Sequence, residues 1–196
     1  MIVQEILTHQ SEITESSGYS LAGSFTRDLI ASKVWLLQHL AQIQHHYTAM
    51  YVLGSWYGNL ALFMKLQPVI SADQIINVEI NPEMLKTSEQ LLDLAGVDNV
   101  EFMLKDANEL DYRQLGNLGV VINTSLTEMP EAEWFEHIPN GTLVAMQARD
   151  NDPGVRYSES QDIQRRYPLS QVLYRGAIQL RDPETEYQRF MTIGRK

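Results

Sequence analysis

Residues 49–59 read AMYVLGSWYGN, a short apolar run that leads into a turn bracketed by two glycines. An amphipathic segment, Leu60 to Leu66, follows directly. This order predicts a strand, a tight turn and a helix. In open α/β folds such a turn presents backbone N–H groups and a helix N-terminus at the carboxyl end of a sheet, where nucleotide-like ligands dock. The stretch therefore predicts a ligand site at this turn.

Two later apolar runs end in acidic residues at a spacing that suits the same site. Residues 75–79 read IINVE and end at Glu79, and residues 100–106 read VEFMLKD and end at Asp106. The carboxyl ends of parallel strands meet at one edge of a sheet, so we expect both acids to lie near the glycine turn.

Strand and helix patterns alternate along most of the chain. The predicted strands are 49–53, 75–79, 100–105, 119–123, 142–147, 171–180 and 187–194, and the predicted helices are 25–47, 60–66, 81–94, 109–115, 131–137 and 158–167. Alternation of this kind predicts a parallel sheet with helices on both faces. The connection at residues 181–185 is too short for a crossover, so the last two strands are predicted to be antiparallel.

The predicted fold class is therefore α/β. We expect a seven-stranded, mostly parallel Rossmann-like sheet with an antiparallel C-terminal strand pair and helices on both faces. The length of 196 residues suits one domain, 1–196, with residues 1–24 as an N-terminal arm or cap. His45 and His46 are predicted to close the first helix, and neighbouring helical residues do not converge on one metal ion.

Composition excludes several classes of function. The chain has no cysteine, which excludes disulfides, thiolate metal sites and cysteine nucleophiles. No stretch resembles a signal peptide or a membrane span, so we expect a cytoplasmic protein without a membrane partner. No metal site is predicted.

Charge is unevenly distributed along the chain. The formal net charge is −10, which makes nucleic acid a less favoured partner than a small molecule or a protein. Residues 1–148 carry 6 Lys and Arg against 18 Asp and Glu, whereas residues 149–196 carry 9 against 7. The basic residues of the second part either form a solvated surface or include the edge of a site for an anionic substrate. The candidates for such an edge are Arg149, Arg156, Arg165 and Arg166.

Five strand–helix units closed by an antiparallel strand pair resemble the class I S-adenosylmethionine-dependent methyltransferase family, over roughly residues 25–194. The glycine loop of that family reads G-x-G-x-G. Here GSWYG at residues 54–58 matches at Gly54 and Gly58, and Trp56 stands in place of the middle glycine. The resemblance implies S-adenosyl-L-methionine as cofactor, with Gly54, Trp56 and Gly58 around its methionine end.

The resemblance also implies roles for the two acidic strand ends. Glu79 would accept hydrogen bonds from both ribose hydroxyls of the cofactor. Asp106 would meet the adenine amino group, and the backbone N–H of Ala107 would meet a ring nitrogen. A second interpretation of Asp106 is an ordinary turn residue that caps the following helix. Trp56 and Tyr57 either pack against the cofactor or fill the core beneath the loop.

The fourth predicted strand ends at Asn123. Amino-group methyltransferases of this fold carry Asn or Asp there, followed by Pro-Pro-Tyr, and this chain matches only the first residue. The resemblance implies that Asn123 borders the cofactor and helps to bind the methyl acceptor. Glu128 is the best-placed carboxylate for a catalytic base. The alternative is that residues 123–128 simply form a capped turn.

The predicted function is in-line methyl transfer to a small molecule or a protein group. Three alternatives stay open: a non-catalytic binding module with this fold, an enzyme that uses S-adenosylmethionine for another reaction, and a nicotinamide-dependent oxidoreductase. The last would need G-x-G-x-x-G, which residues 54–59 do not provide.

Overall fold

The computed structural model describes residues 21–115, 118–129, 131–151 and 157–196. Most of the predicted N-terminal arm, residues 1–20, lies outside this range, as do Pro130 and Arg156, one of the four basic residues noted above. Within the described residues, no helix is both long enough and apolar enough to cross a membrane.

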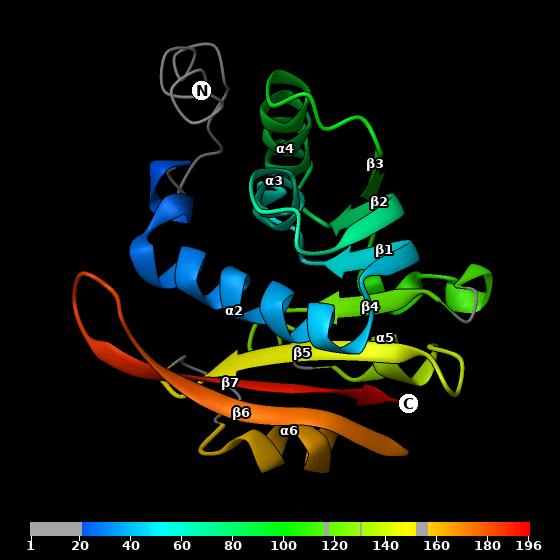
Figure 1. Ribbon diagram of the computed structural model, residues 1–196, viewed down its shortest axis with the longest axis vertical. Coiled ribbons are helices and arrows are strands. Elements are labelled where there is room, and N and C mark those ends of the chain that lie inside the picture. The colour runs from blue at the N-terminus through cyan, green and yellow to red at the C-terminus, as the bar shows by residue number, and fades with distance from the viewer. Residues whose placement is uncertain (1–20, 116–117, 130, 152–156) are drawn as a thin grey trace.

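The described residues form a seven-stranded sheet in the order β3-β2-β1-β4-β5-β7-β6 (Figure 1). The strands are β1 (His46–Leu53), β2 (Ser71–Glu79), β3 (Val100–Leu104), β4 (Val120–Asn123), β5 (Leu143–Arg149), β6 (Gln171–Arg181) and β7 (Glu186–Arg195). β1 to β5 pair in parallel, and β7 is antiparallel to both β5 and β6. The predicted seven-stranded α/β fold and its antiparallel C-terminal pair are confirmed.

The last hairpin explains the antiparallel strand. A helix separates β5 from β6, and only residues 182–185 join β6 to β7. A hairpin this short requires antiparallel pairing. The Asp182 side chain helps to form the turn, because its Oδ1 accepts hydrogen bonds from the Glu184 N–H (2.9 Å) and the Thr185 N–H (2.7 Å). β7 therefore folds back into the space between β5 and β6.

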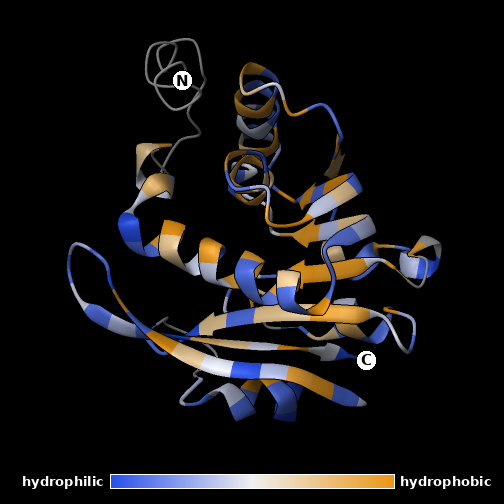
Figure 2. Cartoon of the chain, viewed as in Figure 1, coloured by the Kyte–Doolittle hydropathy of each residue, from blue (hydrophilic) through white to orange (hydrophobic). Residues whose placement is uncertain are grey.

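The helices are η2 (Ala22–Phe25), α2 (Arg27–Ile43), α3 (Asn59–Leu66), α4 (Pro82–Leu94), η3 (Ala107–Glu109), η4 (Tyr112–Gln114), α5 (Glu133–Glu136) and α6 (Ser160–Arg166). α2, α3 and α4 pack with one face of the sheet, and η3, η4, α5 and α6 pack with the other, which gives a separate apolar cluster on each face. In Figure 2, β4 and most of β5 are apolar, as expected for central strands that are covered on both faces, whereas the edge strand β6 mixes polar and apolar residues.

Several predicted boundaries are wrong. The first helix ends at Ile43 instead of Tyr47, because Gln44 is extended (φ −157°, ψ 135°) and His46 already pairs with Ser71 of β2. His46 therefore begins β1, and its ring lies beside Ser71 Oγ and Asp73.

The predicted helix 109–115 is instead two 3₁₀ turns, η3 and η4. The Asp106 and Asp111 side chains accept hydrogen bonds from the N–H groups of Asn108 and Arg113, two residues further on. Local side-chain bonds of this kind compete with a continuous α-helix. The predicted helix 131–137 shortens to α5. The predicted helix 81–94 is confirmed as α4, and the Asn81 side chain caps it by accepting hydrogen bonds from the N–H groups of Glu83 and Met84.

Candidate functional site

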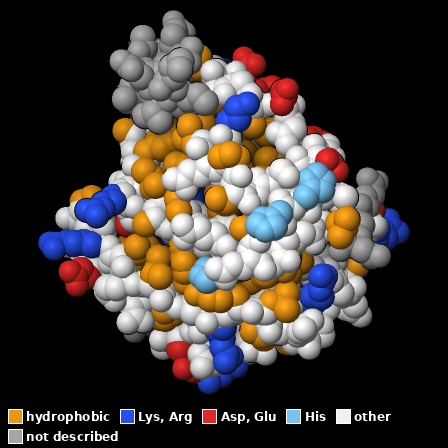
Figure 3. Space-filling view, viewed as in Figure 1, with side chains coloured by type: hydrophobic (Ala, Val, Ile, Leu, Met, Phe, Trp, Pro, Cys, Tyr) orange, Lys and Arg blue, Asp and Glu red, His pale blue; other side chains and the backbone are white. Residues whose placement is uncertain are grey.

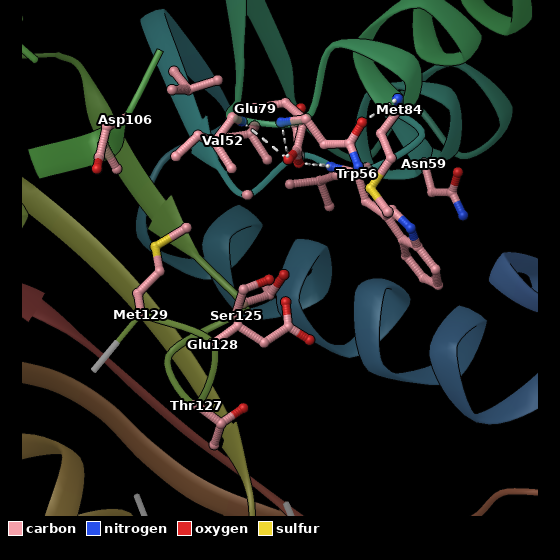
Figure 4. A pocket seen from close by; sticks show the side chains of 18 of the residues that line it. Val52, Trp56, Asn59, Glu79, Met84, Asp106, Ser125, Thr127, Glu128 and Met129 are labelled. Carbon is pink, nitrogen blue, oxygen red and sulfur yellow. Dashed lines mark hydrogen bonds between the residues drawn. The ribbon is translucent and has the colours of Figure 1, made fainter. Parts of the chain in front are cut away.

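A cavity of about 640 Å³ lies at the carboxyl ends of the parallel strands, and Figure 4 shows side chains that line it. We divide its lining into two halves. The β1–β3 half follows the first three strands and contains Gly54, Ser55, Trp56, Asn59, Glu79, Asp106 and Ala107. The β4–β7 half lies toward the other strands and α2 and contains Lys33, Thr124, Ser125, Thr127, Glu128, Arg149 and Arg189.

Glu79 is the best-fixed side chain of the β1–β3 half. The residue is nearly buried (7% exposed), and its carboxylate accepts three backbone hydrogen bonds. Oε2 accepts from the Trp56 N–H at 2.9 Å, and Oε1 accepts from the Ile80 and Asn81 N–H groups at 3.0 Å (Figure 4). A carboxylate has about four lone-pair positions, so these three bonds orient it and leave capacity for a ligand hydroxyl.

Trp56 has an unusual backbone. Its φ of 54° lies in the left-handed region, which costs a residue other than glycine about 1 kcal/mol. The bond from its N–H to Glu79 and the stacking of its ring on Tyr57 (centroids 5.2 Å apart) hold it there. Strain of this kind gathers at functional sites. The two rings differ in surroundings, because Tyr57 is fully buried in the core whereas Trp56 lines the cavity.

Gly58 lies beneath the loop and is not among the described residues that line the cavity. Its φ is +70°, and a Cβ there would overlap Ser88 Oγ and come within 2.8 Å of Leu92 Cδ1 and 2.9 Å of Asn77 Nδ2. Glycine at this position therefore lets the loop approach α4 closely, and its direct role is in packing.

Asp106 and Ala107 both line the cavity after β3. Asp106 Oδ1 accepts a hydrogen bond from the Asn108 N–H at 2.9 Å, so the capping interpretation of this residue describes one of its contacts. Ala107 is nearly buried, and its carbonyl accepts a hydrogen bond from the Tyr112 hydroxyl at 3.0 Å. The backbone at the adenine position of the resemblance is thus well held.

The two predicted catalytic residues are not placed alike. Asn123 is fully buried, and among the described residues it is not part of the cavity lining. Its Oδ1 accepts a hydrogen bond from the Ser125 N–H at 2.9 Å, and its Nδ2 lies 3.2 Å from Met129 Sδ, so it shapes the turn after β4. Glu128 lies on that turn, lines the cavity and points toward α2 (Figure 4).

A buried polar network joins α2 to β5 and β7 behind the β4–β7 half. Ser32 Oγ donates to Gln147 Oε1 at 2.9 Å, and Gln147 Nε2 donates to the Ser32 carbonyl at 3.2 Å. Arg189 Nε also donates to Gln147 Oε1 at 3.4 Å, and its Nη2 donates to the Thr124 carbonyl at 2.8 Å. This network joins the N-terminal half of α2, which contains Ser32, to β5 and β7.

A second buried bond strengthens the same contact. The Tyr187 hydroxyl of β7 donates to Asp28 Oδ2 of α2 at 2.7 Å. Burial alone would raise the pKa of Asp28, but hydrogen bonds from the side chains of Tyr187 and Thr26 and from the local backbone outweigh it, so the pKa is lowered.

Lys33 is a cavity-lining cation that the sequence analysis did not single out. It lies one residue after Ser32, half-buried, and lines the cavity. Burial and the charge of Arg189 lower the pKa of Lys33 to about 8, and the charge of Glu128 opposes this. Sequence reasoning also missed Arg189 and Asn59, because their positions on β7 and α3 carry no motif; Arg149 was noted only through the charge imbalance.

The cavity contains unused hydrogen-bonding atoms. Ser55 Oγ and Asn59 Oδ1 are buried without a hydrogen-bond partner among the described residues, and both residues line the cavity beside the glycine turn. Buried polar atoms are normally satisfied, so these two atoms indicate that a polar ligand group fits here.

Comparison with known proteins identifies the fold. No protein-family profile and no curated protein sequence matches the chain. Solved structures do match. Magnesium protoporphyrin IX methyltransferase from Synechocystis, with S-adenosylhomocysteine bound, is 13% identical with a TM-score of 0.63 over 98% of both chains. An rRNA methylase from Streptococcus thermophilus is 17% identical with a TM-score of 0.56 over 87% of this chain and 98% of that one.

A third match is the TrmK protein of M. capricolum, also with S-adenosylhomocysteine bound. It is 12% identical with a TM-score of 0.57, over 80% of this chain and 66% of that chain. The chain therefore has the class I methyltransferase fold, with its cavity at the strand ends.

Proposed function

We propose that this chain, as a single domain, is an S-adenosylmethionine-dependent methyltransferase that acts on a small molecule or a protein group. The observation that carries the proposal is Glu79, a buried carboxylate held by three backbone N–H groups at the end of β2, beside the glycine turn. The fold supports it, as do two similar structures that contain S-adenosylhomocysteine.

The residues of the β1–β3 half fit the parts of this cofactor. Glu79 would accept hydrogen bonds from the ribose hydroxyls, and Asp106 with the Ala107 N–H would meet the adenine. Gly54 and Trp56 would border the methionine end, with Ser55 Oγ and Asn59 Oδ1 as further partners for its polar groups. Gly58 would act indirectly, by letting the loop pack against α4.

The chemistry asks mainly for alignment. When bound, the cofactor supplies a methyl group on a positively charged sulfur, which is already activated for in-line displacement. The contribution of the protein is to hold donor and acceptor in line, and positioning of this kind can lower a barrier by about 7–11 kcal/mol. Glu128 would accept a proton from an acceptor that has one to lose, and Asn123 would shape the turn that borders both ligands.

Two further functions remain distinguishable by experiment. A binding module with this fold would retain the cavity but would not catalyse methyl transfer. The strained backbone of Trp56 in the glycine loop motivates this hypothesis. An enzyme that transfers another part of S-adenosylmethionine would bind the same cofactor and release different products.

Calorimetric titration of the protein with S-adenosylmethionine, S-adenosylhomocysteine and NAD tests the proposal. We expect micromolar binding of the two adenosyl-sulfur compounds and none of NAD. If none of the three compounds binds, the methyltransferase proposal is wrong and the binding module is favoured. If only NAD binds, an oxidoreductase is favoured. Mass analysis of the cofactor products then separates methyl transfer from transfer of another group.

A further inference from the structure

The β4–β7 half of the cavity contains three cations from three separate elements: Lys33 from α2, Arg149 from the end of β5 and Arg189 from β7. They converge although the whole chain has a net charge of −10. On the face shown in Figure 3, charged side chains lie mostly toward the periphery. Three cations inside one half of a cavity are therefore a local reversal of the general charge.

The two arginines are held in place by neighbouring groups. Arg189 is 6% exposed, and its guanidinium donates to the Thr124 carbonyl and to Gln147. Gln147 in turn exchanges two hydrogen bonds with Ser32, the residue before Lys33. Arg149 pairs with Arg189 in the sheet register, and its guanidinium lies 5.5 Å from the centre of the Tyr187 ring. Anchored cations lose little side-chain entropy when a ligand binds.

The cations also repel one another. The positive charge of Arg189 disfavours protonation of Lys33, whose pKa of about 8 still leaves it mostly protonated at pH 7. An anion placed between them would remove this repulsion and add charge-assisted hydrogen bonds. Glu128 and Glu131, which follow β4, also line the cavity and already balance part of the positive charge, so the lining suits an acceptor with few negative groups.

We propose that the methyl acceptor is a small molecule with a carboxylate group, and that Lys33 and Arg149 bind this carboxylate with the support of Arg189. The inference rests on the proposed methyltransferase function and specifies its substrate class. A polynucleotide is disfavoured, because a phosphate backbone needs cations on an outer surface, whereas Arg189 is buried and the chain as a whole is acidic.

The test uses benzoate as the probe and benzamide as its uncharged counterpart, each titrated into protein saturated with S-adenosylhomocysteine. We expect benzoate to bind and benzamide to bind at least tenfold more weakly. Lys33→Met and Arg149→Gln should each weaken benzoate at least tenfold while changing the affinity for S-adenosylhomocysteine less than threefold. Lys105→Met, which removes a cation from the opposite side of the same cavity, should leave benzoate affinity within twofold.

Other results would overturn the inference in distinct ways. Equal binding of benzoate and benzamide would show that the cations do not select an anion. A tenfold loss of S-adenosylhomocysteine affinity in Lys33→Met would assign Lys33 to the cofactor carboxylate instead. Phenyl phosphate binding much tighter than benzoate would indicate a phosphorylated acceptor, and tight binding of a short RNA hairpin would indicate a nucleic acid. If the unaltered protein does not bind S-adenosylhomocysteine, the proposed function itself has failed.

Discussion

The two halves of the cavity are built from contacts of very different range in the sequence. In the β1–β3 half, Glu79 bonds to residues 1, 2 and 23 positions away. In the β4–β7 half, Arg189 bonds to a residue 65 positions away, Ser32 to one 115 away and Asp28 to one 159 away. The comparison teaches that one half is assembled by a local motif and the other only by the completed fold. Variants can test this difference.

The largest effect is expected for Gly58→Ala, in the packing beneath the glycine loop of the β1–β3 half. The new Cβ would need a left-handed backbone and would collide with the side chains of Ser88, Leu92 and Asn77. We expect a loss of about 2–4 kcal/mol in the free energy of unfolding, from backbone strain and overpacking together. Urea denaturation measures this.

Gly96→Ala is the matched control. Gly96 has a similar φ of +65°, but a Cβ there meets nothing within 4 Å. Gly96→Ala should lower the free energy of unfolding by about 1 kcal/mol, from backbone strain alone. Equal losses at the two positions would show that close packing of the loop against α4 contributes nothing.

The next largest effect concerns cofactor binding through Glu79. Glu79→Ala removes a carboxylate that the proposal assigns to the ribose hydroxyls, and it leaves three N–H groups without their acceptor. Hydrogen bonds to charged groups are worth about 1.5–3 kcal/mol, so the affinity for S-adenosylhomocysteine should fall at least tenfold. Calorimetry checks this, with Glu89→Ala, an exposed acid on α4, as control. If a folded Glu79→Ala protein binds S-adenosylhomocysteine with unchanged affinity, the assignment of Glu79 to the ribose is wrong.

A third prediction addresses the long-range bonds of the β4–β7 half. Tyr187→Phe removes the hydroxyl that bonds to Asp28, and we expect a loss of about 1.5–2 kcal/mol in the free energy of unfolding at pH 7. The pKa of Asp28 is lowered from 3.8, so its contribution is present above pH 4 and is lost as the pH falls through the folded pKa. The difference in the free energy of unfolding between the original protein and Tyr187→Phe should therefore become smaller at acidic pH.

Tyr47→Phe serves as the control for this prediction. The buried Tyr47 hydroxyl donates to an uncharged group, the Leu40 carbonyl, at 3.1 Å. Removal of this hydroxyl should lower the free energy of unfolding by about 1 kcal/mol, and this loss should be the same at pH 7 and at pH 3. If the loss for Tyr187→Phe is also independent of pH, the hydrogen bond from Tyr187 to an ionised Asp28 is contradicted.

The smallest expected effect is a gain of stability. The folded pKa of Lys33 is about 8, below its usual 10.5, so between these values the unfolded chain binds more protons than the folded one. The resulting penalty is full below pH 8 and disappears as the pH rises toward 10.5. Because the side chain is only half-buried, we expect Lys33→Met to be more stable by on the order of 1–2 kcal/mol at pH 7.

Denaturation at pH 7 and pH 9.5 tests this prediction. The advantage of Lys33→Met should shrink at the higher pH, whereas Lys86→Met, at an exposed position on α4, should show little effect at either pH. A variant that is less stable than the original protein at pH 7 would contradict the idea that Lys33 is kept for binding at the expense of stability.

Much of the fold could be predicted from the sequence. The apolar runs around Leu53 and Val78, the Asn81-Pro82 start of α4 and the short link at 181–185 all specify structure through neighbours within a few residues. The predictions that failed did so where distant contacts prevail. His46 was assigned to a helix, but it pairs with Ser71 on another strand.

The candidate site divides in the same way. The amino-acid sequence by itself determined the glycine turn, the acid at the end of β2 and the acid after β3, because a parallel strand places its last residue at the same edge of the sheet as its neighbours. Only the tertiary structure decided that Lys33, Arg149 and Arg189 meet. Their elements are brought together because α2 packs along the sheet with its N-terminal half at the cavity and because β7 inserts beside β5. Nothing local in the sequence encodes a contact that spans more than a hundred residues.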